Sequence, residues 1–326
     1  MSTTETHHPV PSAAPSSPDS TPEHWVGRRR WHIPWLQLVA CLVILAGVCV
    51  FLYPHAASWF AQKEQSRVTE LAKTQLDSPP NNDEAYRQQQ LEMAHEYNGA
   101  LSSGALYEAN ANVAVGAGES SDNSFDYEAL LRTTDTGVMG RLQYEALQID
   151  LPIYHGTSDE TLLKGVGHLE GTSLPVGGVD TRSVLTAHRG LPQATLFNDL
   201  DKSKNGDTFT ISVLGQVLTY RVVETKVIDP GDTEAILTDR KRDLVTLVTC
   251  TPLGINTHRI LVTGERITPT PKHDLLAAQA EPELPGFPWW VVGLGATVVV
   301  LAGYIWVAGR PSREREHERE RANSKS

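Results

Sequence analysis

The chain has 326 residues and a formal net charge of −11, and its charge and hydropathy divide it into parts. Residues 31–62 and 284–309 contain no Asp, Glu, Lys or Arg, and each stretch includes a run of about twenty mostly apolar residues, long enough to cross a bilayer as a helix. Residues 54–287 hold 19 basic and 32 acidic residues. This pattern argues against a freely soluble protein, and so acidic a segment argues against a nucleic acid as partner.

The N-terminal part predicts a tail followed by a membrane span. Residues 1–34 begin with a stretch rich in Ser, Thr and Pro, so we expect a disordered cytoplasmic tail. Residues 35–53 predict a transmembrane helix, and the basic cluster Arg28, Arg29 and Arg30 just before it belongs on the cytoplasmic side. A cleaved signal peptide is the alternative. The apolar run is longer than usual for one, and no Ala-x-Ala site stands directly after it.

A second span near the C-terminus predicts that the chain crosses the membrane twice. Residues 288–309 are apolar, with tryptophan and tyrosine near both ends, where such rings favour the membrane interface. Residues 310–326 form a charged, arginine-rich tail. Positive charge outside both spans predicts cytoplasmic termini and an extracytoplasmic segment 54–287 at the cell membrane. A buried helical hairpin in a soluble protein is the alternative.

Residues 54–136 predict helices and then a long loop. Residues 62–77 and 82–102 are rich in Glu, Gln, Ala and Leu, and Pro79-Pro80 separates them into two helices. Residues 103–125 are rich in Gly, Ala, Asn and Ser and show little periodicity. A loop of this length within a compact domain is commonly functional.

Residues 137–270 predict a mainly β domain, which residues 271–287 link to the second span. A turn at 213–217 joins two of the strands as a hairpin. Seven or eight short strands favour an antiparallel barrel or a sandwich. The candidate strands are residues 138–142, 147–154, 183–188, 207–214, 217–228, 243–250 and 259–268.

Cys250 is the candidate nucleophile of the exported segment. The other two cysteines, Cys41 and Cys49, lie in the first span, so Cys250 has no disulfide partner in its own domain. It ends a strand-like run and precedes Thr251-Pro252 and a loop. A small buried apolar side chain is the ordinary alternative. A reactive thiolate would need a neighbouring base or cation.

His188 and Arg259 are the candidates for those neighbours. His188 ends another strand-like run before a turn, the same setting as Cys250, whereas His168 and His258 are competing choices. Arg259 follows an eight-residue loop that returns an antiparallel strand to the end where Cys250 lies, so its guanidinium can stabilise an oxyanion there. Structural hydrogen bonding and a surface ion pair are the alternatives. We expect no cofactor and no metal, because no phosphate-binding loop, His-Glu-x-x-His or Cys-x-x-Cys occurs.

The ordered motifs resemble those of class C sortases, the pilus-assembling branch of that family. The resemblance rests on TLVTC (246–250) with TPLGINTHRILVTGER, on LPIYHGTSDETLLKGVGHLEGTSLPVGG (151–178) and on SVLTAHRGLPQATLFNDLD (183–201). It implies an eight-stranded sortase-type β-barrel, with N-terminal helices and two flanking transmembrane helices. It also implies a cysteine transpeptidase with Cys250 as nucleophile, His188 as general acid/base and Arg259 as oxyanion stabiliser; His168 remains structural.

The resemblance further implies substrates and leaves alternatives. The implied reaction cleaves an LPxTG-like sorting signal between Thr and Gly through a thioester and transfers it to an amine, which in pilus assembly is a pilin lysine. A cell-wall-anchoring sortase, a sorting-signal hydrolase and an inactive membrane-anchored binding domain are the alternatives.

The sequence departs from the family pattern in two places. Residues 103–136 lack the Asp-Pro-aromatic lid motif, so we expect a differently anchored lid around 110–118. Leu253 stands where relatives often have Tyr. We also expect the loop 229–242 to shape specificity.

Overall fold

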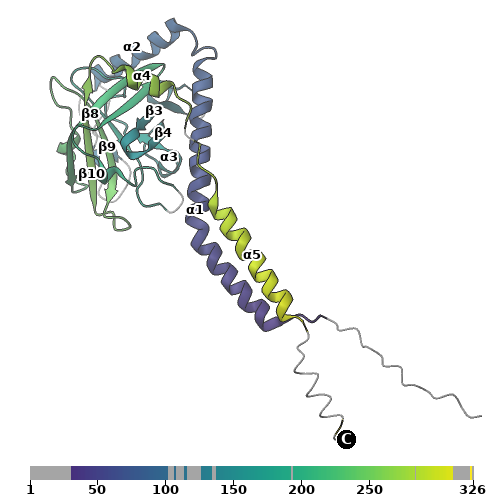
Figure 1. Ribbon diagram of the computed structural model, residues 1–326. Helices are drawn as coiled ribbons and strands as arrows, with labels where there is room; N and C mark the ends of the chain where they lie inside the picture. Colours follow the sequence, from purple (N-terminus) through teal and green to yellow (C-terminus); the bar gives the residue numbers. More distant parts are fainter. Residues whose placement is uncertain are drawn as a thin grey trace, which may run out of the picture. The chain divides into compact units, whose positions relative to one another are not determined.

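The computed structural model describes residues 31–101, 106–107, 114–115, 126–133, 137–191, 194–282, 284–310 and 324. The chain forms two compact units. Among the described residues, one unit includes residues 31–43 and 299–310, and the other lies within residues 44–298. The second unit contains the β-structure, whose strands lie close together in Figure 1.

Eight strands of the second unit form a closed barrel in the order β10-β8-β7-β3-β4-β5-β6-β9. The eight-stranded barrel is therefore confirmed. The antiparallel pairing expected from the strand pattern holds for six of the eight neighbouring pairs, whereas β4 pairs with β5 and β6 pairs with β9 in parallel. The strands are β3 (Val138–Tyr144), β4 (Ile149–His155), β5 (Val166–His168), β6 (Thr181–Thr186), β7 (Thr208–Val213), β8 (Gln216–Ile228), β9 (Asp243–Thr251) and β10 (His258–Ile267).

The parallel pair β4–β5 has a local cause in the short helix α3 (Asp159–Lys164). A parallel pair needs a crossover that carries the chain back to its starting end, and α3 lies within that crossover. The helix is capped by Ser158, whose hydroxyl accepts a hydrogen bond from the backbone N–H of Thr161 at 3.2 Å. Acidic residues in the first turn and Lys164 in the last turn complement the helix dipole.

The predicted hairpin at 213–217 joins β7 and β8. Val213 pairs with Gln216, so the loop between them has two residues, Leu214 and Gly215. Both have positive φ, 46° and 84°. Positive φ at both positions matches the twist of the flanking strands, and glycine adopts it at the second position without strain.

Alternation along the strands divides the buried side chains into two clusters. The larger cluster fills the barrel interior, and its largest fully buried members include Tyr144, Phe197, Phe209 and Tyr220. The smaller cluster lies on the opposite face of β6, β9 and β10. It consists of Leu169, Val184, Ile236, Val248 and Leu261.

The predicted helices of the N-terminal segment are present, with one difference. Helix α1 (Trp35–Leu76) continues from the predicted span through Pro54 without interruption, whereas we expected a separate helix from residue 62. Helix α2 (Glu84–Ala100) follows Pro79-Pro80 and is capped by Asp83, whose carboxylate accepts from the N–H of Ala85 at 2.9 Å. The linker 271–287 contains a helix that we did not expect, α4 (Lys272–Gln279).

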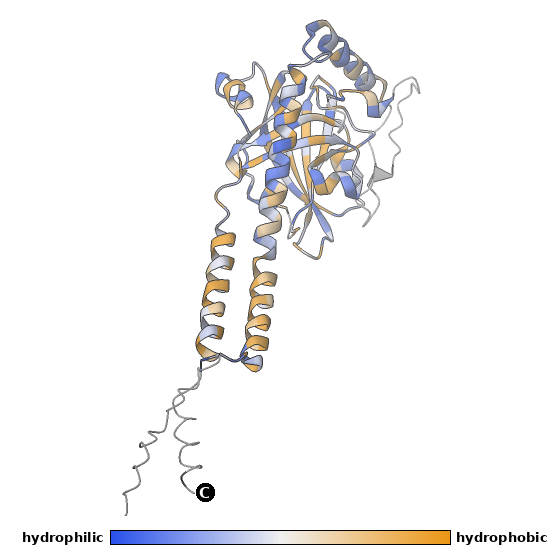
Figure 2. Cartoon of the chain, turned by 90° about the vertical axis from the view of Figure 1, so that its right-hand side faces the viewer, coloured by the Kyte–Doolittle hydropathy of each residue, from blue (hydrophilic) through white to orange (hydrophobic). Residues whose placement is uncertain are grey.

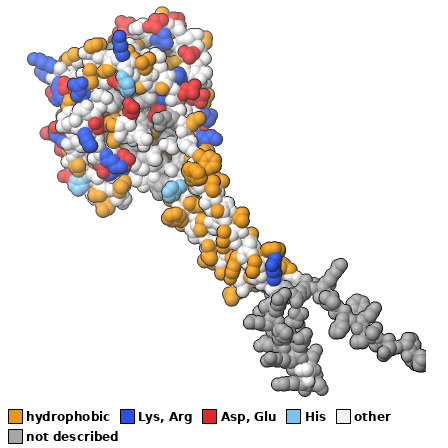
Figure 3. All heavy atoms as spheres, viewed as in Figure 1, with side chains coloured by type: hydrophobic (Ala, Val, Ile, Leu, Met, Phe, Trp, Pro, Cys, Tyr) orange, Lys and Arg blue, Asp and Glu red, His pale blue; other side chains and the backbone are white. Residues whose placement is uncertain are grey.

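Helices α1 and α5 (Trp289–Ala308) are long and apolar enough to cross a membrane. Figure 2 colours α5 and the first half of α1 mostly as hydrophobic, and Figure 3 shows hydrophobic side chains on the surface of this part of the chain. Only 6% of the most apolar window of α1, and 0% of that of α5, is buried within the described chain. That exposure argues against the alternative of a buried hairpin in a soluble protein.

The expected lid around residues 110–118 falls largely outside the described residues. Of that stretch, the structure describes only Ala114–Val115, which form strand β2. Strand β2 pairs in antiparallel fashion with β1 (Leu106–Tyr107).

Candidate active site

Cys250 and Arg259 face each other across two neighbouring strands. They are antiparallel partners in the β9–β10 register, and their exposed fractions are only 8% and 4%. Residues directly opposite each other in such a pair have Cβ atoms about 4.5–5.5 Å apart on the same face of the sheet. The Nη1 group of Arg259 donates to the carbonyl oxygens of Asn256 (2.9 Å), in the loop after β9, and of His258 (3.1 Å), the first residue of β10. The guanidinium is therefore held beside the thiol.

His188 lies two residues beyond β6, whose parallel register with β9 continues to it. The last ladder pair is Thr186 with Val248. The N–H of Ala187 then donates to the carbonyl of Val248 (3.2 Å), and the Thr249 hydroxyl donates to the carbonyl of Ala187 (2.8 Å). One step further along both strands, the register brings His188 beside Cys250.

The three predicted residues share the outer face of the barrel. Side chains alternate between faces along a strand, and Cys250 stands two residues from Val248, which belongs to the outer cluster. Arg259 stands two residues from Leu261 of the same cluster, and His188 stands four residues from Val184. The structure thus brings all three side chains to one end of one face.

The loop 229–242 covers the next part of that face. Its 3-10 turn η4 (Thr233–Ile236) places Ile236, which is 3% exposed, in the outer cluster against β6, β9 and β10. The loop therefore packs beside the three predicted site residues. Its role in specificity stays a prediction.

The local electrostatics favour an uncharged resting pair. Burial raises the pKa of the Cys250 thiol, and the neighbouring Arg259 charge opposes part of that rise. Burial lowers the pKa of the His188 imidazole, and Asp159 opposes that change. At neutral pH the resting site accordingly holds a thiol and a neutral imidazole. The imidazole can accept the thiol proton as attack begins, and Arg259 can stabilise negative charge on an oxygen bonded to the attacked carbon.

The competing histidines lie in different surroundings. His168 is fully buried, its Nε2 lies 2.9 Å from the carbonyl of Ser173, and its Nδ1 lies 2.9 Å from the Tyr127 hydroxyl. Burial lowers the pKa of His168 to about 4. His258 is exposed, and its Nε2 lies 3.3 Å from Asp229. These contacts account for His168 as a structural group, whereas His258 lies at the surface beside a carboxylate.

Leu253 forms part of the wall next to the site. It is 54% exposed and lies in the loop after Cys250. Gly190 lies in the loop after His188, and a Cβ atom added to it would stand only 2.7 Å from Cδ2 of Leu253. The two loops that follow the predicted catalytic residues therefore pack against each other. Sequence reasoning noted Leu253 but missed the contact, because the signal was only a glycine two residues after His188.

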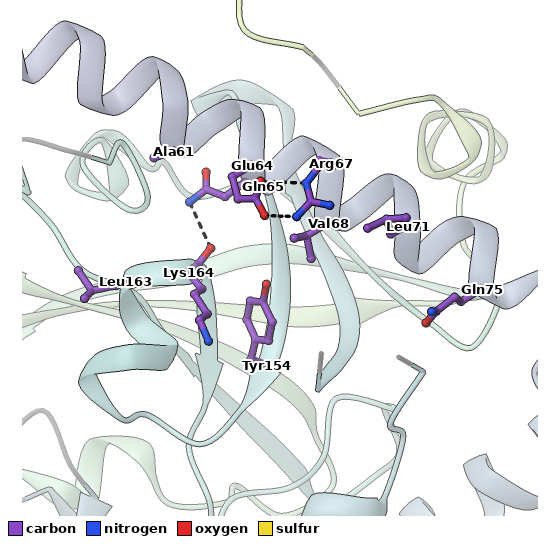
Figure 4. Close-up of a pocket in the computed structure, with 10 residues that line it drawn as sticks. All are labelled: Ala61, Glu64, Gln65, Arg67, Val68, Leu71, Gln75, Tyr154, Leu163 and Lys164. Carbon is purple, nitrogen blue, oxygen red and sulfur yellow. Dashed lines mark hydrogen bonds and ion pairs between the residues drawn. The ribbon is translucent and has the colours of Figure 1, made fainter. Parts of the chain in front are cut away.

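A separate cavity of about 600 Å³ lies between α1 and the barrel. Figure 4 shows Tyr154 below the helix, with Gln65 donating to the carbonyl of Lys164 at 3.4 Å and Arg67 paired with Glu64. Burial and the Glu64 charge raise the pKa of Tyr154 to about 12, so its phenol stays neutral. None of the three predicted site residues lines this cavity.

Among the described residues, no group of three or more His, Cys, Asp or Glu side chains is arranged to hold a metal ion.

Comparisons with known proteins single out one family. A family model described as "Sortase domain" matches residues 142–267. Sortase D of Bacillus subtilis (strain 168) is 30% identical over 132 residues, which is 40% of this chain and 64% of that protein. The match thus spans slightly less than two thirds of that relative.

Two solved structures extend the comparison over nearly their whole length. Sortase C of Streptococcus pneumoniae has a TM-score of 0.53 at 38% identity, covering 62% of this chain and 98% of the other. Sortase C1 of Streptococcus agalactiae has a TM-score of 0.51 at 41% identity, covering 59% and 92%.

Proposed function

This chain belongs to the sortase family of cysteine transpeptidases, and we propose that it cleaves an LPxTG-like sorting signal between Thr and Gly and transfers the new carboxyl end to an amine. The observation that carries the proposal is the register that brings Cys250, His188 and Arg259 together on three neighbouring segments. A nucleophile, a base and a fixed cation on one face are the groups that acyl transfer needs.

The proposed acylation step uses each group once. The Cys250 sulfur bonds to the threonine carbonyl carbon while its proton moves to His188, and the carbonyl oxygen takes up negative charge beside Arg259. The C–N bond to glycine then breaks, and the His188 imidazolium gives its proton to the departing amine. The product is a thioester on Cys250 together with the released C-terminal peptide.

Deacylation reverses these roles. An amine attacks the thioester carbonyl and loses a proton to His188, the C–S bond breaks, and the Cys250 thiol is restored as it regains the proton. Burial helps both steps, because the neutral imidazole available at neutral pH is the form that accepts a proton. The products are a new amide bond and the free enzyme.

The proposed acceptor is a lysine of a pilin. The Streptococcus pneumoniae relative is described with pilin substrate specificity, and this chain resembles it at 38% identity over 98% of its length. Cell-wall amines and water are the competing acceptors.

We also propose that α1 and α5 anchor the chain in the membrane as two passes, with residues 54–287 outside the cytoplasm. Two apolar helices with exposed side chains support this topology. Confining enzyme and membrane-tethered substrates to one surface would raise their effective concentration. Protease added outside sealed, right-side-out vesicles should remove residues 54–287 and spare epitopes at both termini; digestion of either epitope would contradict it.

The deciding experiment incubates the full-length chain in detergent with a pilin domain that carries a sorting signal. We expect a ladder of covalent multimers with the wild type and with Cys49→Ala, and none with Cys250→Ala. Cys49 is a matched control because it is an exposed cysteine in α1. A single adduct to a peptidoglycan amine would show that the acceptor is a cell-wall amine rather than a pilin lysine. Formation of only the cleaved acid would show that the acceptor is water. A ladder with Cys250→Ala would refute the catalytic assignment.

A further inference from the structure

Arg189 makes three contacts from one guanidinium directly beside the proposed site. Its Nη2 pairs with Asp201 Oδ2 at 2.6 Å, its Nε donates to the carbonyl of Asn198 at 2.9 Å, and its Nη1 donates to the Thr251 hydroxyl at 3.2 Å. Only 7% of the side chain is exposed. Each nitrogen is thus used by a different partner, and the planar guanidinium fixes the angles between them.

The contact with Thr251 continues the register that brings His188 beside Cys250. Ala187 is linked to Thr249 on one side of that pair, and Arg189 is linked to Thr251 on the other side. His188 and Cys250 are therefore bracketed by two cross-strand links. The ladder itself ends earlier, at Thr186 and Val248, so these side-chain links extend it to the reacting residues.

Further hydrogen bonds hold the backbone around His188. The carbonyl of His188 accepts from the N–H of Phe197 at 3.1 Å, and Phe197 is fully buried. The N–H of Gly190 donates to the Asn198 side chain at 2.6 Å. Asp201 lies in the adjacent 3-10 turn η3 (Leu200–Lys202). Arg189 connects this framework to the strand that carries Cys250.

Arg189 does not share a face with the reacting groups. Because side chains alternate along an extended chain, Arg189 and Thr251 point away from the face that carries His188 and Cys250. A role for Arg189 in the reaction would therefore be indirect.

We propose that Arg189 is a positioning residue that holds His188 in register with Cys250 by tying Thr251 to Asn198 and Asp201. The proposal rests on the proposed function. Without the Thr251 link, the segment that carries His188 can move relative to the end of β9. A displacement of about 1 Å at reacting groups costs on the order of 100-fold in rate, so the effect belongs in kcat rather than in KM.

The sharpest test changes Thr251 and leaves the buried arginine and its ion pair in place. Thr251→Val removes the hydroxyl with little change of shape, and Thr251→Ser keeps it. In the full-length chain, with an LPxTG-type peptide as probe, we expect Thr251→Val and Arg189→Gln to lower kcat by about 10- to 100-fold at unchanged KM. Thr251→Ser should retain the wild-type kcat.

Arg141→Gln is the matched control for losing a buried arginine. Arg141 pairs with Asp150 and donates to the carbonyl oxygens of Ala278 and Ala280. It lies on β3, which is four strands away from β9, the strand of Cys250, in either direction around the closed barrel. We expect it to lower the melting temperature and leave kcat unchanged. A kcat for Thr251→Val within about twofold of Thr251→Ser, or equal kcat losses in Arg141→Gln and Arg189→Gln, would overturn the positioning role.

A second readout separates this proposal from the proposed function. The rate at which iodoacetamide alkylates Cys250, followed by mass spectrometry of its peptide, needs no sorting signal. We expect His188→Ala, Arg189→Gln and Thr251→Val to slow alkylation by a similar factor, and Thr251→Ser not to. If the wild type fails to cleave the peptide but this pattern appears, the proposed function fails and the positioning role stands. If Thr251→Val alkylates as fast as the wild type, the positioning role fails.

Discussion

Gly190→Ala should destabilise the chain by about 1.5–3.5 kcal/mol through two separable effects. Gly190 has a φ of +79°, where an L side chain costs about 1–2 kcal/mol. The added Cβ would stand 2.7 Å from Leu253 Cδ2. Because Leu253 is half exposed, it can turn aside, so this contact costs only about 0.5–1.5 kcal/mol.

Thermal unfolding of the full-length chain in detergent measures both effects, since 1 kcal/mol corresponds to about 2–4 °C for a domain of 150–250 residues. In a Leu253→Ala background, Gly190→Ala should lose only the backbone part, so the two changes should couple by about 0.5–1.5 kcal/mol. Gly206→Ala is the control, because Gly206 has a φ of +96° with nothing within 4 Å of an added Cβ. Equal losses in both Leu253 backgrounds would refute the packing of the two loops.

Four further predictions concern the site and its supports. A plot of kcat/KM against pH should rise with an apparent pKa below about 6.5, because burial lowers the pKa of His188. It should fall at higher pH with an apparent pKa above the ordinary thiol value, because burial raises the pKa of Cys250. A profile set by two unshifted pKa values would contradict the effect of burial. Arg259→Gln should lower kcat by about 100- to 1000-fold in peptide cleavage, whereas a loss confined to KM would remove its oxyanion role. Ile236→Ala should loosen η4 by about 2 kcal/mol, seen as roughly 30-fold faster hydrogen exchange of its amides; unchanged exchange would show that the outer cluster does not hold the turn. A histidine in the unfolded chain has a pKa near 6.5, whereas the buried His168 has a pKa of about 4, so only the unfolded chain takes up this proton between those pH values. The free energy of unfolding should therefore fall by about 3 kcal/mol as the pH is lowered from about 6.5 to about 4. His168→Asn should make this fall smaller.

Much of the barrel could be predicted because its strands have alternating or continuous apolar patterns bounded by turn residues. Strands β8, β9 and β10 begin and end within about one residue of their predicted bounds. Strand β5 was missed because its three residues are too few to show a period. Helix α3 had a readable signal in Ser158, followed by Asp159 and Glu160, but its six residues are shorter than the usual helical pattern.

The site was less predictable than the strands that carry it. That Cys250 and Arg259 are neighbours follows from the loop between two antiparallel strands, whose length the sequence shows. That β6 lies beside β9 in parallel could not be read from local pattern, because the two are separated by two other strands in the sequence. The placement of His188 beside Cys250 therefore depended on the family resemblance. The contacts of Arg189 with Asn198, Asp201 and Thr251 became visible only in the structure.

The most direct test of the account is the intact mass of the full-length chain after brief incubation with an LPxTG-type peptide and no acceptor amine. We expect an adduct equal to the peptide truncated after threonine, located on Cys250, released by hydroxylamine and missing from Cys250→Ala. An adduct that persists in Cys250→Ala, or cleavage of the peptide by that variant, would contradict the claim that Cys250 carries the acyl group.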